Sequence, residues 1–508
     1  MTRAAGWVSS CTMRQRLALA FGAGVVSALG LAPFNQPLLA LLGLAGLCLV
    51  LMPVETVKSA FWTGLAGGIG YFVLSLHWIV DPFFVDPWRH GWMAPFALVL
   101  MSAGLALFWA GAAVAALRFG RSGPGRMILW ALFLTVAEIL RASVLTGFPW
   151  AHPGHIWIGS PLMGLAAWIG PHGLTLLTLL LAVGLAAALW SRPMLAGLPA
   201  AVLAAAFGLA ALIPSAPVAG ADAAIVRLVQ PNAPQHLKWQ PEMIPVFFRR
   251  SLDLTASEPQ LDRPPDLVIW PETALPALLR NSDPWREAIG VASGDARVIV
   301  GGQRLQGGMV RNSLFLLEND GALAATYDKH HLVPFGEYIP LTGLARAAGL
   351  RGLAEVAGAG YTPGSGPDLL DLGPLGRAFP MICYETIFPA YIRQVDRPDW
   401  QIQITNDAWF GNFSGPYQHL ELAQLRAVEQ GLPLLRAANT GVSAVIDARG
   451  QVLASLPLGE YGALDVRLPP ALTATFYART GDWPVAAVLI ALIGAALLRA
   501  RKNAALIP

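Results

Sequence analysis

Three residues with different chemistry each follow a short apolar run and precede a turn-like segment. Glu272 ends "LVIWPE", Lys329 ends "AATYDK" and Cys383 ends "FPMIC". A thiolate is a good nucleophile, an ammonium stabilises a neighbouring anion, and a carboxylate within reach can take a thiol proton. The set predicts covalent catalysis, with Cys383 as nucleophile, Glu272 as general base, and Lys329 stabilising the thiolate and a tetrahedral oxyanion.

Each of these residues also has an ordinary structural interpretation. A free cysteine is commonly a small buried hydrophobe, a glutamate after proline can belong to the first turn of a helix, and a turn lysine can be solvated. The cysteines Cys11, Cys48 and Cys383 are too widely spaced for a disulfide framework or a zinc site. The nine histidines form neither HxxxH nor HExxH, so we predict no metal.

The composition is that of a membrane protein. Hydrophobic residues make up 55 % of the 508 residues and charged residues 13 %, where a soluble protein has about 25 % charged residues. The mean hydropathy is +0.53. A net charge of +3 without a basic run gives no reason to expect a nucleic-acid partner.

Apolar runs long enough for a bilayer, which needs ~20 residues, occur at both ends of the chain. They cover about 15–33, 37–53, 58–80, 91–117, 127–146, 161–190, 195–214 and 483–498. We therefore predict an α-helical transmembrane bundle of about eight spans. Residues 1–214 would hold seven helices, residues 478–500 the eighth, and residues 501–508 a cytoplasmic tail.

Basic residues predict the orientation of this bundle, because they are enriched in cytoplasmic loops. With a cytoplasmic N-terminus, two basic residues lie outside, Arg89 and Arg141, and eleven lie inside. The eleven are Arg3, Arg14, Arg16, Lys58, Arg118, Arg121, Arg126, Arg192, Arg499, Arg501 and Lys502. Both termini are then cytoplasmic and residues 220–470 lie on the outer face. Within a span, Glu138 is expected to pair with Arg141 three residues later.

Residues 220–470 have the pattern of a layered α/β domain. Strand-like segments such as "AAIVRLVQ", "ARVIVGGQR" and "WQIQITND" alternate with helical ones, for instance "PVFFRRSLDLTA" (245–256) and "HLELAQLRAVEQ" (419–430). "NSLFLLEND" and "GALAATYDK" predict a hairpin that turns at Asn319, Asp320 and Gly321. Reactive residues at strand ends are where layered α/β folds commonly build active sites.

The motifs "WPETALP", "YDKHHLVPFGEYIP" and "ICYE", in this order, resemble the nitrilase (carbon-nitrogen hydrolase) superfamily. That resemblance implies an αββα sandwich with a Glu–Lys–Cys triad. Together with the apolar helices, further segments make the whole chain resemble bacterial apolipoprotein N-acyltransferases. These are "TGFPW" (146–150), "QPNAPQHLKW" (230–239), "NDAWFGNFSGPYQH" (406–419) and "LRAVEQGLPLLRAANTG" (425–441).

The resemblance implies a membrane acyltransferase that performs the last step of lipoprotein maturation. The sn-1 acyl chain of a phospholipid, typically phosphatidylethanolamine, would move to the N-terminal amine of a diacylglyceryl apolipoprotein through a thioester on the cysteine, without a cofactor. The protein would be a monomer in the bacterial inner membrane, with its catalytic domain periplasmic. Two alternatives are a membrane-tethered amidase or nitrile hydrolase with the same triad, and a transporter or scaffold with an inactive domain, which would have lost the triad.

The resemblance also implies supporting and substrate-binding residues. Three supporting residues are expected at Glu337, which would hold Lys329 or the incoming amine, and at Glu385 and Tyr384 beside the nucleophile. Substrate-binding residues are expected at Trp239, Asn406, Trp409, Phe410 and Trp150. A structural salt bridge is the alternative for the acids, and packing or an ordinary interfacial aromatic belt is the alternative for the aromatic residues.

Overall fold

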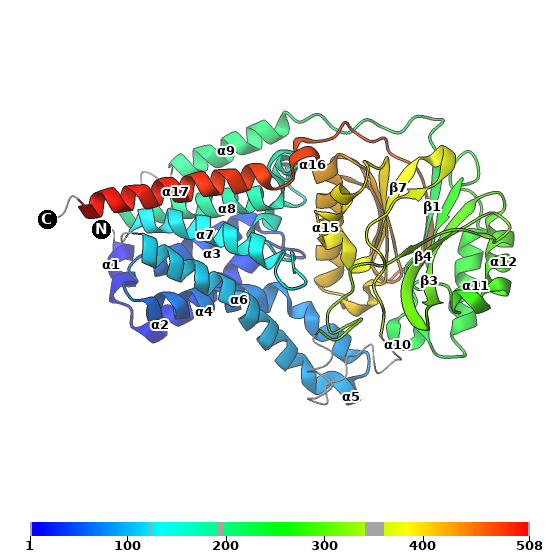
Figure 1. Cartoon of the computed structure of the whole chain (residues 1–508), viewed down its shortest axis with the longest axis horizontal. Coiled ribbons are helices and arrows are strands. Elements are labelled where there is room, and N and C mark those ends of the chain that lie inside the picture. The colour runs from blue at the N-terminus through cyan, green and yellow to red at the C-terminus, as the bar shows by residue number, and fades with distance from the viewer. Residues whose placement is uncertain (1–2, 121–122, 192–196, 341–359, 506–508) are drawn as a thin grey trace. The chain divides into compact units, whose positions relative to one another are not determined.

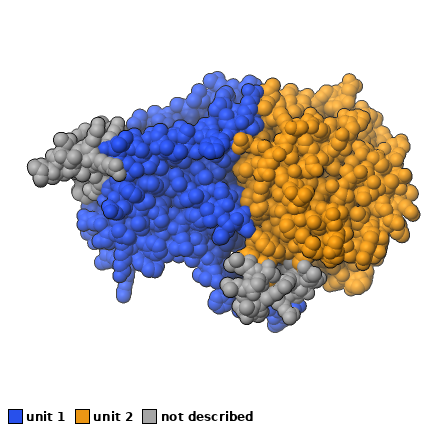
Figure 2. Space-filling view, in the orientation of Figure 1, with its two compact units in different colours: residues 1–214, 475–508 blue, residues 215–474 orange. Residues whose placement is uncertain are grey.

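The computed structural model describes residues 3–120, 123–191, 197–340 and 360–505 (Figure 1). The chain forms two compact units, which Figure 2 colours separately. The helical unit consists of Met1–Pro214 and Thr475–Pro508, and the α/β unit consists of Ser215–Ala474.

The helical unit has a helix at each apolar run found in the sequence. Its longer helices are α1 (Arg3–Ser10), α2 (Met13–Ala28), α3 (Pro37–Leu51), α4 (Val57–Ser75), α6 (Ala94–Phe119), α7 (Pro124–Arg141), α8 (Ala166–Ser191), α9 (Gly197–Ala211) and α17 (Trp483–Ala505). Two short helices, α5 (Pro87–His90) and α16 (Phe476–Thr480), lie between them in the chain.

The expectation of about eight spans is supported only in part. Among the described residues, two helical stretches are long and apolar enough to cross a membrane, Pro87–Phe119 and Pro161–Ser191. A third counts if Val57–Ser75 and His77–Phe84, which meet at a 48° bend, form one span. Helices α3 and α9 have 15 residues each, fewer than the ~20 that a straight crossing requires.

Helices α2 and α4 approach each other closely because glycine lies at their contact. A Cβ on Gly24 would lie 2.0 Å from the Gly67 carbonyl oxygen, and one on Gly70 would lie 2.1 Å from the Phe21 carbonyl oxygen. Small residues of this kind let helix backbones pack together where no water drives association. The apolar character of the two helices therefore does not by itself determine their packing.

A buried polar cluster holds the loop after α7. Glu138 accepts a hydrogen bond from Trp109 Nε1 (3.0 Å), lies 2.7 Å from His152 Nδ1, and forms the predicted ion pair with Arg141. Arg141 also donates to the Trp150 carbonyl oxygen at 2.9 Å. The cluster compensates the charge of Glu138 away from water, as a carboxylate inside an apolar bundle requires.

Within its described residues, the α/β unit contains two six-stranded sheets. The first has the order β12-β1-β2-β3-β4-β5 and the second β11-β10-β9-β8-β7-β6. Neighbouring strands are parallel in β1–β2–β3 and β7–β8–β9 and antiparallel elsewhere. The first sheet comprises β1 (Ile225–Gln230), β2 (Leu267–Ile269), β3 (Arg297–Gln306), β4 (Met309–Leu317), β5 (Leu323–Asp328) and β12 (Gly462–Arg467). The second comprises β6 (Leu370–Asp371), β7 (Arg377–Ile382), β8 (Trp400–Thr405), β9 (Leu434–Ala438), β10 (Ser443–Ile446) and β11 (Val452–Leu456).

Helices cover the outer faces of both sheets. Helices α11 (Ile244–Thr255) and α12 (Asp283–Ser293) lie on the first sheet, and α15 (Gly415–Gln430) lies on the second (Figure 1). One core joins Phe248 of α11 to Trp270 and Phe315, and the other joins Ala427 of α15 to Phe379. This arrangement is the predicted αββα sandwich, a nitrilase-like fold.

The predicted hairpin is confirmed and brings Lys329 to the neighbouring strand. Gly321 has the positive φ of +81° that the turn needs, and its N–H donates to the Glu318 carbonyl oxygen (2.9 Å). Strand β5 then pairs with β4, so that the Lys329 N–H donates to the Asn312 carbonyl oxygen at 2.9 Å. A lysine and an asparagine that are far apart in sequence thus lie side by side.

Candidate active site

Glu272 lies three residues beyond the end of β2, where the chain turns sharply. Gly301 of β3 lies against this turn: its N–H donates to the Pro271 carbonyl oxygen (3.2 Å), and a Cβ there would lie 2.6 Å from Glu272 Cα. Thr273 follows with φ +49°, a conformation that costs a residue with a side chain about 1–3 kcal/mol. Proline ends the strand, and the turn aims the next side chain away from the sheet ladder.

Lys329 lies between two carboxylates at the end of β5. Its Nζ is 2.9 Å from Glu337 Oε2 and 3.8 Å from Glu272 Oε1. The Asn312 amide donates to Glu272 Oε1 (2.7 Å) and Glu337 Oε1 (3.2 Å), bridging both acids. Burial acts to lower the pKa of Lys329, but Glu337 and Glu272 outweigh it and raise this pKa, so the side chain is an ammonium.

Cys383 begins the short 3-10 helix η8 (Cys383–Ile387), directly after β7, and has φ +54°. Its pKa is raised, first by burial and then by the Glu272 carboxylate, while Lys329 and a hydrogen bond with Thr405 act in the opposite direction. Lys329 acts to lower this pKa, as expected of a neighbouring ammonium, but desolvation outweighs it and the net shift is upward. Cys383 therefore rests as a thiol, and to act as a nucleophile it would need a base to remove its proton.

Glu385 connects the chain segments that carry Lys329 and Cys383. Its carboxylate accepts from the N–H of His330 (2.8 Å), the N–H of Ile382 (2.8 Å) and the hydroxyl of Tyr327 (3.1 Å). Burial acts to raise the pKa of Glu385, but the His330 side chain above all, which lies 2.6 Å away, together with the Ile382 N–H and the Lys329 charge, holds the pKa below its ordinary value. The side chain is 1 % exposed, so its contacts position the site from within.

Tyr384, the residue after Cys383, packs through its ring. It is buried, and its ring centroid lies 5.6 Å from that of His331 and 5.2 Å from that of Phe388. A contribution of its main-chain N–H to an oxyanion hole stays a prediction.

A second buried cluster supports the carbonyl group of Cys383. His419 Nε2 lies 3.1 Å from the Cys383 carbonyl oxygen, and His419 Nδ1 lies 3.0 Å from Asp407 Oδ1. Asp407 is also paired with Arg436, and although burial raises its pKa, Arg436 and His419 lower that pKa to about 2. The sequence analysis did not identify this cluster or Asn312. For Asn312, His419 and Arg436 the available signal was a polar residue within an otherwise buried strand or helix.

Four of the residues expected to bind substrate belong to the α/β unit. Asn406 donates its main-chain N–H to Glu272 Oε2 (2.9 Å), which makes it a neighbour of the acid. Phe410 is 8 % exposed and packs edge-on to His419, with 5.3 Å between centroids, whereas Trp239 and Trp409 are 42 % and 37 % exposed. Of these four residues, Trp239 and Trp409 are therefore the two whose side chains are exposed enough to contact a ligand.

Trp150 belongs to the helical unit and is buried there. It is 1 % exposed, and its ring packs against those of Trp78 (4.6 Å between centroids) and Phe148 (6.4 Å). Its contacts within this unit explain its burial without a lipid.

Family models cover both units. Residues 23–184 match the apolipoprotein N-acyltransferase N-terminal domain, and residues 254–478 match the carbon-nitrogen hydrolase family. An apolipoprotein N-acyltransferase of Caulobacter vibrioides is 40 % identical, with 96 % of this chain and 95 % of that protein covered. The chain belongs to the apolipoprotein N-acyltransferase family.

Other relatives carry the same name. An apolipoprotein N-acyltransferase of Bradyrhizobium diazoefficiens is 39 % identical, with 97 % of this chain and 96 % of that protein covered. Among solved structures, a CN-hydrolase superfamily protein from Xanthomonas campestris is 21 % identical with a TM-score of 0.37, covering 52 % of this chain and 96 % of its own. Family membership rests on the full-length relatives.

Proposed function

We propose that this apolipoprotein N-acyltransferase family member transfers the sn-1 acyl chain of a phospholipid, with phosphatidylethanolamine as the expected donor. The acceptor is the N-terminal amine of a diacylglyceryl-modified apolipoprotein, and the intermediate is a thioester on Cys383. The proposal is supported by the Lys329–Glu272 ion pair, by the electrostatic effect of both groups on the pKa of Cys383, and by the apolipoprotein N-acyltransferases that match the chain over nearly its full length.

In the first half-reaction, the sulfur of Cys383 attacks the ester carbonyl and Glu272 takes the thiol proton. The developing oxyanion is stabilised by the Lys329 ammonium. The carbon–oxygen bond of the ester then breaks, and Glu272 returns the proton to the departing oxygen, which leaves a lysophospholipid and a thioester. The raised pKa of Cys383 makes the proton transfer to Glu272 part of the attack.

In the second half-reaction, the α-amine of the diacylglyceryl-cysteine attacks the thioester. Glu272 takes a proton from the amine and returns it to the sulfur as the carbon–sulfur bond breaks. An amide and a free thiol result. An ester is exchanged for a thioester and then for an amide, so no cofactor or separate activation step is required. Glu337 holds the Lys329 ammonium through both half-reactions.

The helical unit keeps the reaction at a membrane. Pulling an acyl chain into water would cost ~0.8 kcal/mol for each exposed CH₂ group, which a membrane-held enzyme avoids. We propose about eight spans in the bacterial inner membrane, with both termini cytoplasmic. The catalytic domain, residues 220–470, is then periplasmic and meets both lipid substrates in the same leaflet, with Trp239 and Trp409 exposed toward them.

Trapping the intermediate tests the proposal. The full-length protein in detergent is incubated with a phospholipid that carries a labelled sn-1 chain, and the peptide containing Cys383 is examined by mass spectrometry. We expect one labelled acyl group on this peptide, none in Cys383→Ala, and none on Cys11 or Cys48. Full acyl transfer by Cys383→Ala would refute the mechanism.

The second substrate separates the transferase from a hydrolase. The labelled enzyme is given a diacylglyceryl-cysteine peptide, and acylated peptide and free fatty acid are measured together. A transferase gives the acylated peptide as the main product. Release of fatty acid at the same rate with and without the peptide would instead identify a membrane-tethered hydrolase.

A further inference from the structure

We propose that the short helix α10 (Gln235–Lys238), through the buried ammonium of Lys238, positions Glu272 as the base. Lys238 is a positioning residue here, because it acts through Glu272 and not on the substrate. The inference deepens the proposed function and rests on Glu272 being the base. It concerns a lysine that the Glu–Lys–Cys chemistry does not use.

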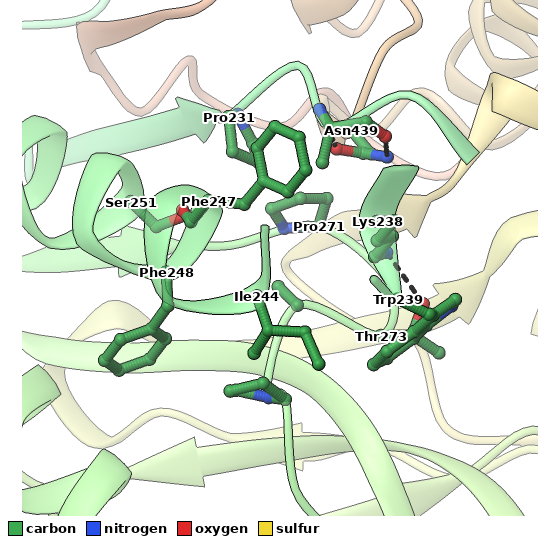
Figure 3. Close-up of a pocket in the computed structure, with 13 residues that line it drawn as sticks. Pro231, Lys238, Trp239, Ile244, Phe247, Phe248, Ser251, Pro271, Thr273 and Asn439 are labelled. Atoms are coloured by element: carbon green, nitrogen blue, oxygen red, sulfur yellow. Dashed lines mark hydrogen bonds between the residues drawn. The ribbon is translucent and has the colours of Figure 1, made fainter. Parts of the chain in front are cut away.

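Lys238 holds the sharp turn that carries Glu272. Its Nζ donates to the Glu272 carbonyl oxygen (3.2 Å) and to the hydroxyl of Thr273 (3.0 Å), the second of which Figure 3 shows as a dashed line. Thr273 has the positive φ of +49°, so the Lys238 ammonium stabilises the strained main-chain conformation at this residue. Gly301 packs against the same turn through main-chain contacts.

A second connection runs from the other end of α10 to the carboxylate itself. Gln235 Oε1 accepts a hydrogen bond from the side chain of Asn406 (2.8 Å). The main-chain N–H of Asn406 in turn donates to Glu272 Oε2 (2.9 Å). One four-residue helix therefore reaches Glu272 twice, once through its carbonyl group and once through its carboxylate, along independent routes.

The surroundings of Lys238 explain why its charge matters. Among the thirteen described residues that line the pocket in Figure 3, Lys238 is the only charged one. Burial lowers the pKa of Lys238 to about 8, and the Glu272 carboxylate opposes this decrease. On its own helix His236 is exposed, and the Trp239 ring centroid lies 5.5 Å from Nζ. The ammonium is thus the one charge that this lining places near the Glu272 turn.

The test follows the reactivity of Cys383 toward iodoacetamide, which requires no lipid. The rate of alkylation of the Cys383 peptide in the full-length protein is measured by mass spectrometry over a pH series. The acidic limb is the low-pH part of this rate–pH profile, and the variant Glu272→Gln shows how much of it depends on Glu272. We expect Lys238→Met to slow alkylation at neutral pH about tenfold. The acidic limb should also move to higher pH, because a cation near the carboxylate is lost.

Two further variants separate positioning from packing. Lys238→Arg keeps the charge and the donors, so the acidic limb should return to that of the wild type. Thr273→Val removes one acceptor and keeps the charge, so alkylation should slow by about threefold while the limb stays in place. Lys58→Met, which removes an exposed lysine of the helical unit, should change neither quantity.

Several outcomes would overturn the inference. One is a Lys238→Met protein with the alkylation rate and the limb of the wild type. Another is an equal loss in Lys238→Met and Lys238→Arg with no movement of the limb, which means that Lys238 only packs. Should Lys238→Met fail to fold, an unchanged rate in Thr273→Val decides against the proposal. If Lys238→Met shifts the acidic limb but the wild-type protein forms no acyl-enzyme with a phospholipid, the positioning role of Lys238 stands and only the proposed function is contradicted.

Discussion

Gly301 lies at a place in β3 where any side chain would displace the proposed base. A Cβ there would lie 2.6 Å from Glu272 Cα, 2.6 Å from the Pro271 carbonyl oxygen and 2.7 Å from Thr273 N, and all three are main-chain atoms. Ordinary contact begins near 3.4 Å, so Gly301→Ala must move the turn by about 0.8 Å. Glu272 also contacts Asn312 and Asn406, and this movement strains both hydrogen bonds.

A displacement of about 1 Å costs roughly 100-fold in a positioned reaction, so we expect Gly301→Ala to slow formation of the Cys383 acyl-enzyme by about that factor. This corresponds to about 2.7 kcal/mol in the activation barrier. The assay is single-turnover labelling of Cys383 by a phospholipid with a labelled sn-1 chain, followed by mass spectrometry.

The neighbouring Gly302→Ala provides a matched control for stability. A Cβ on Gly302 meets side chains, Phe315 at 2.8 Å and Leu275 at 3.1 Å, and not the turn. It should lower the melting temperature while slowing acyl-enzyme formation by less than about threefold. A folded Gly301→Ala protein that acylates Cys383 at the wild-type rate would refute the reasoning about the turn.

Four further predictions follow from individual contacts. Asn312→Leu leaves both site carboxylates without their shared donor and should destabilise the protein by about 1–3 kcal/mol, measured by denaturant unfolding, besides slowing acylation. The pKa of Glu385 is lower in the folded than in the unfolded protein, so the ionised side chain stabilises the fold above the unfolded-state pKa. This stabilisation is lost as pH falls through the folded-state pKa. Glu385→Gln should therefore flatten the acidic part of a plot of melting temperature against pH. Arg436→Met strands the buried Asp407 charge, at a cost of about 3–5 kcal/mol in unfolding free energy, and adding Asp407→Asn should restore most of it. Alkylation of Cys383 should still rise with pH beyond the range in which an ordinary thiol has levelled off, since its pKa is raised; an early plateau would contradict this.

The strand ends could be predicted from the sequence because apolar runs that stop at a reactive residue are local features. Glu272, Lys329 and Cys383 do follow β2, β5 and β7. The turn at Gly321 is local as well, since a glycine after Asn319 and Asp320 permits the positive φ.

The partners of these residues could not be predicted, because they come from strand pairing over long distances in the sequence. Asn312 is a mid-strand residue that meets Glu272 only once β3 and β4 are paired, and Lys238 is one of several polar residues of the segment that becomes α10. The direction of the pKa shift of Cys383 depends on burial, which is a tertiary property. Apolar composition likewise located the helices, but it did not determine how many of them cross the membrane. Helix α7, for example, lies at an apolar run and yet carries the Glu138 cluster, and it is not among the candidate spans.

Burial of Cys383 has two consequences that favour acyl transfer over hydrolysis. It raises the pKa of the thiol, so under the proposed mechanism the free enzyme holds a weakly nucleophilic thiol until Glu272 takes the proton. The same burial, with 5 % of the residue exposed, limits the approach of water to a thioester formed there. An amine delivered by a bound lipid substrate does not depend on that access. Under the proposed mechanism we therefore expect the acyl-enzyme to persist until an acceptor arrives, and rapid loss of the label from Cys383 in buffer alone would contradict this.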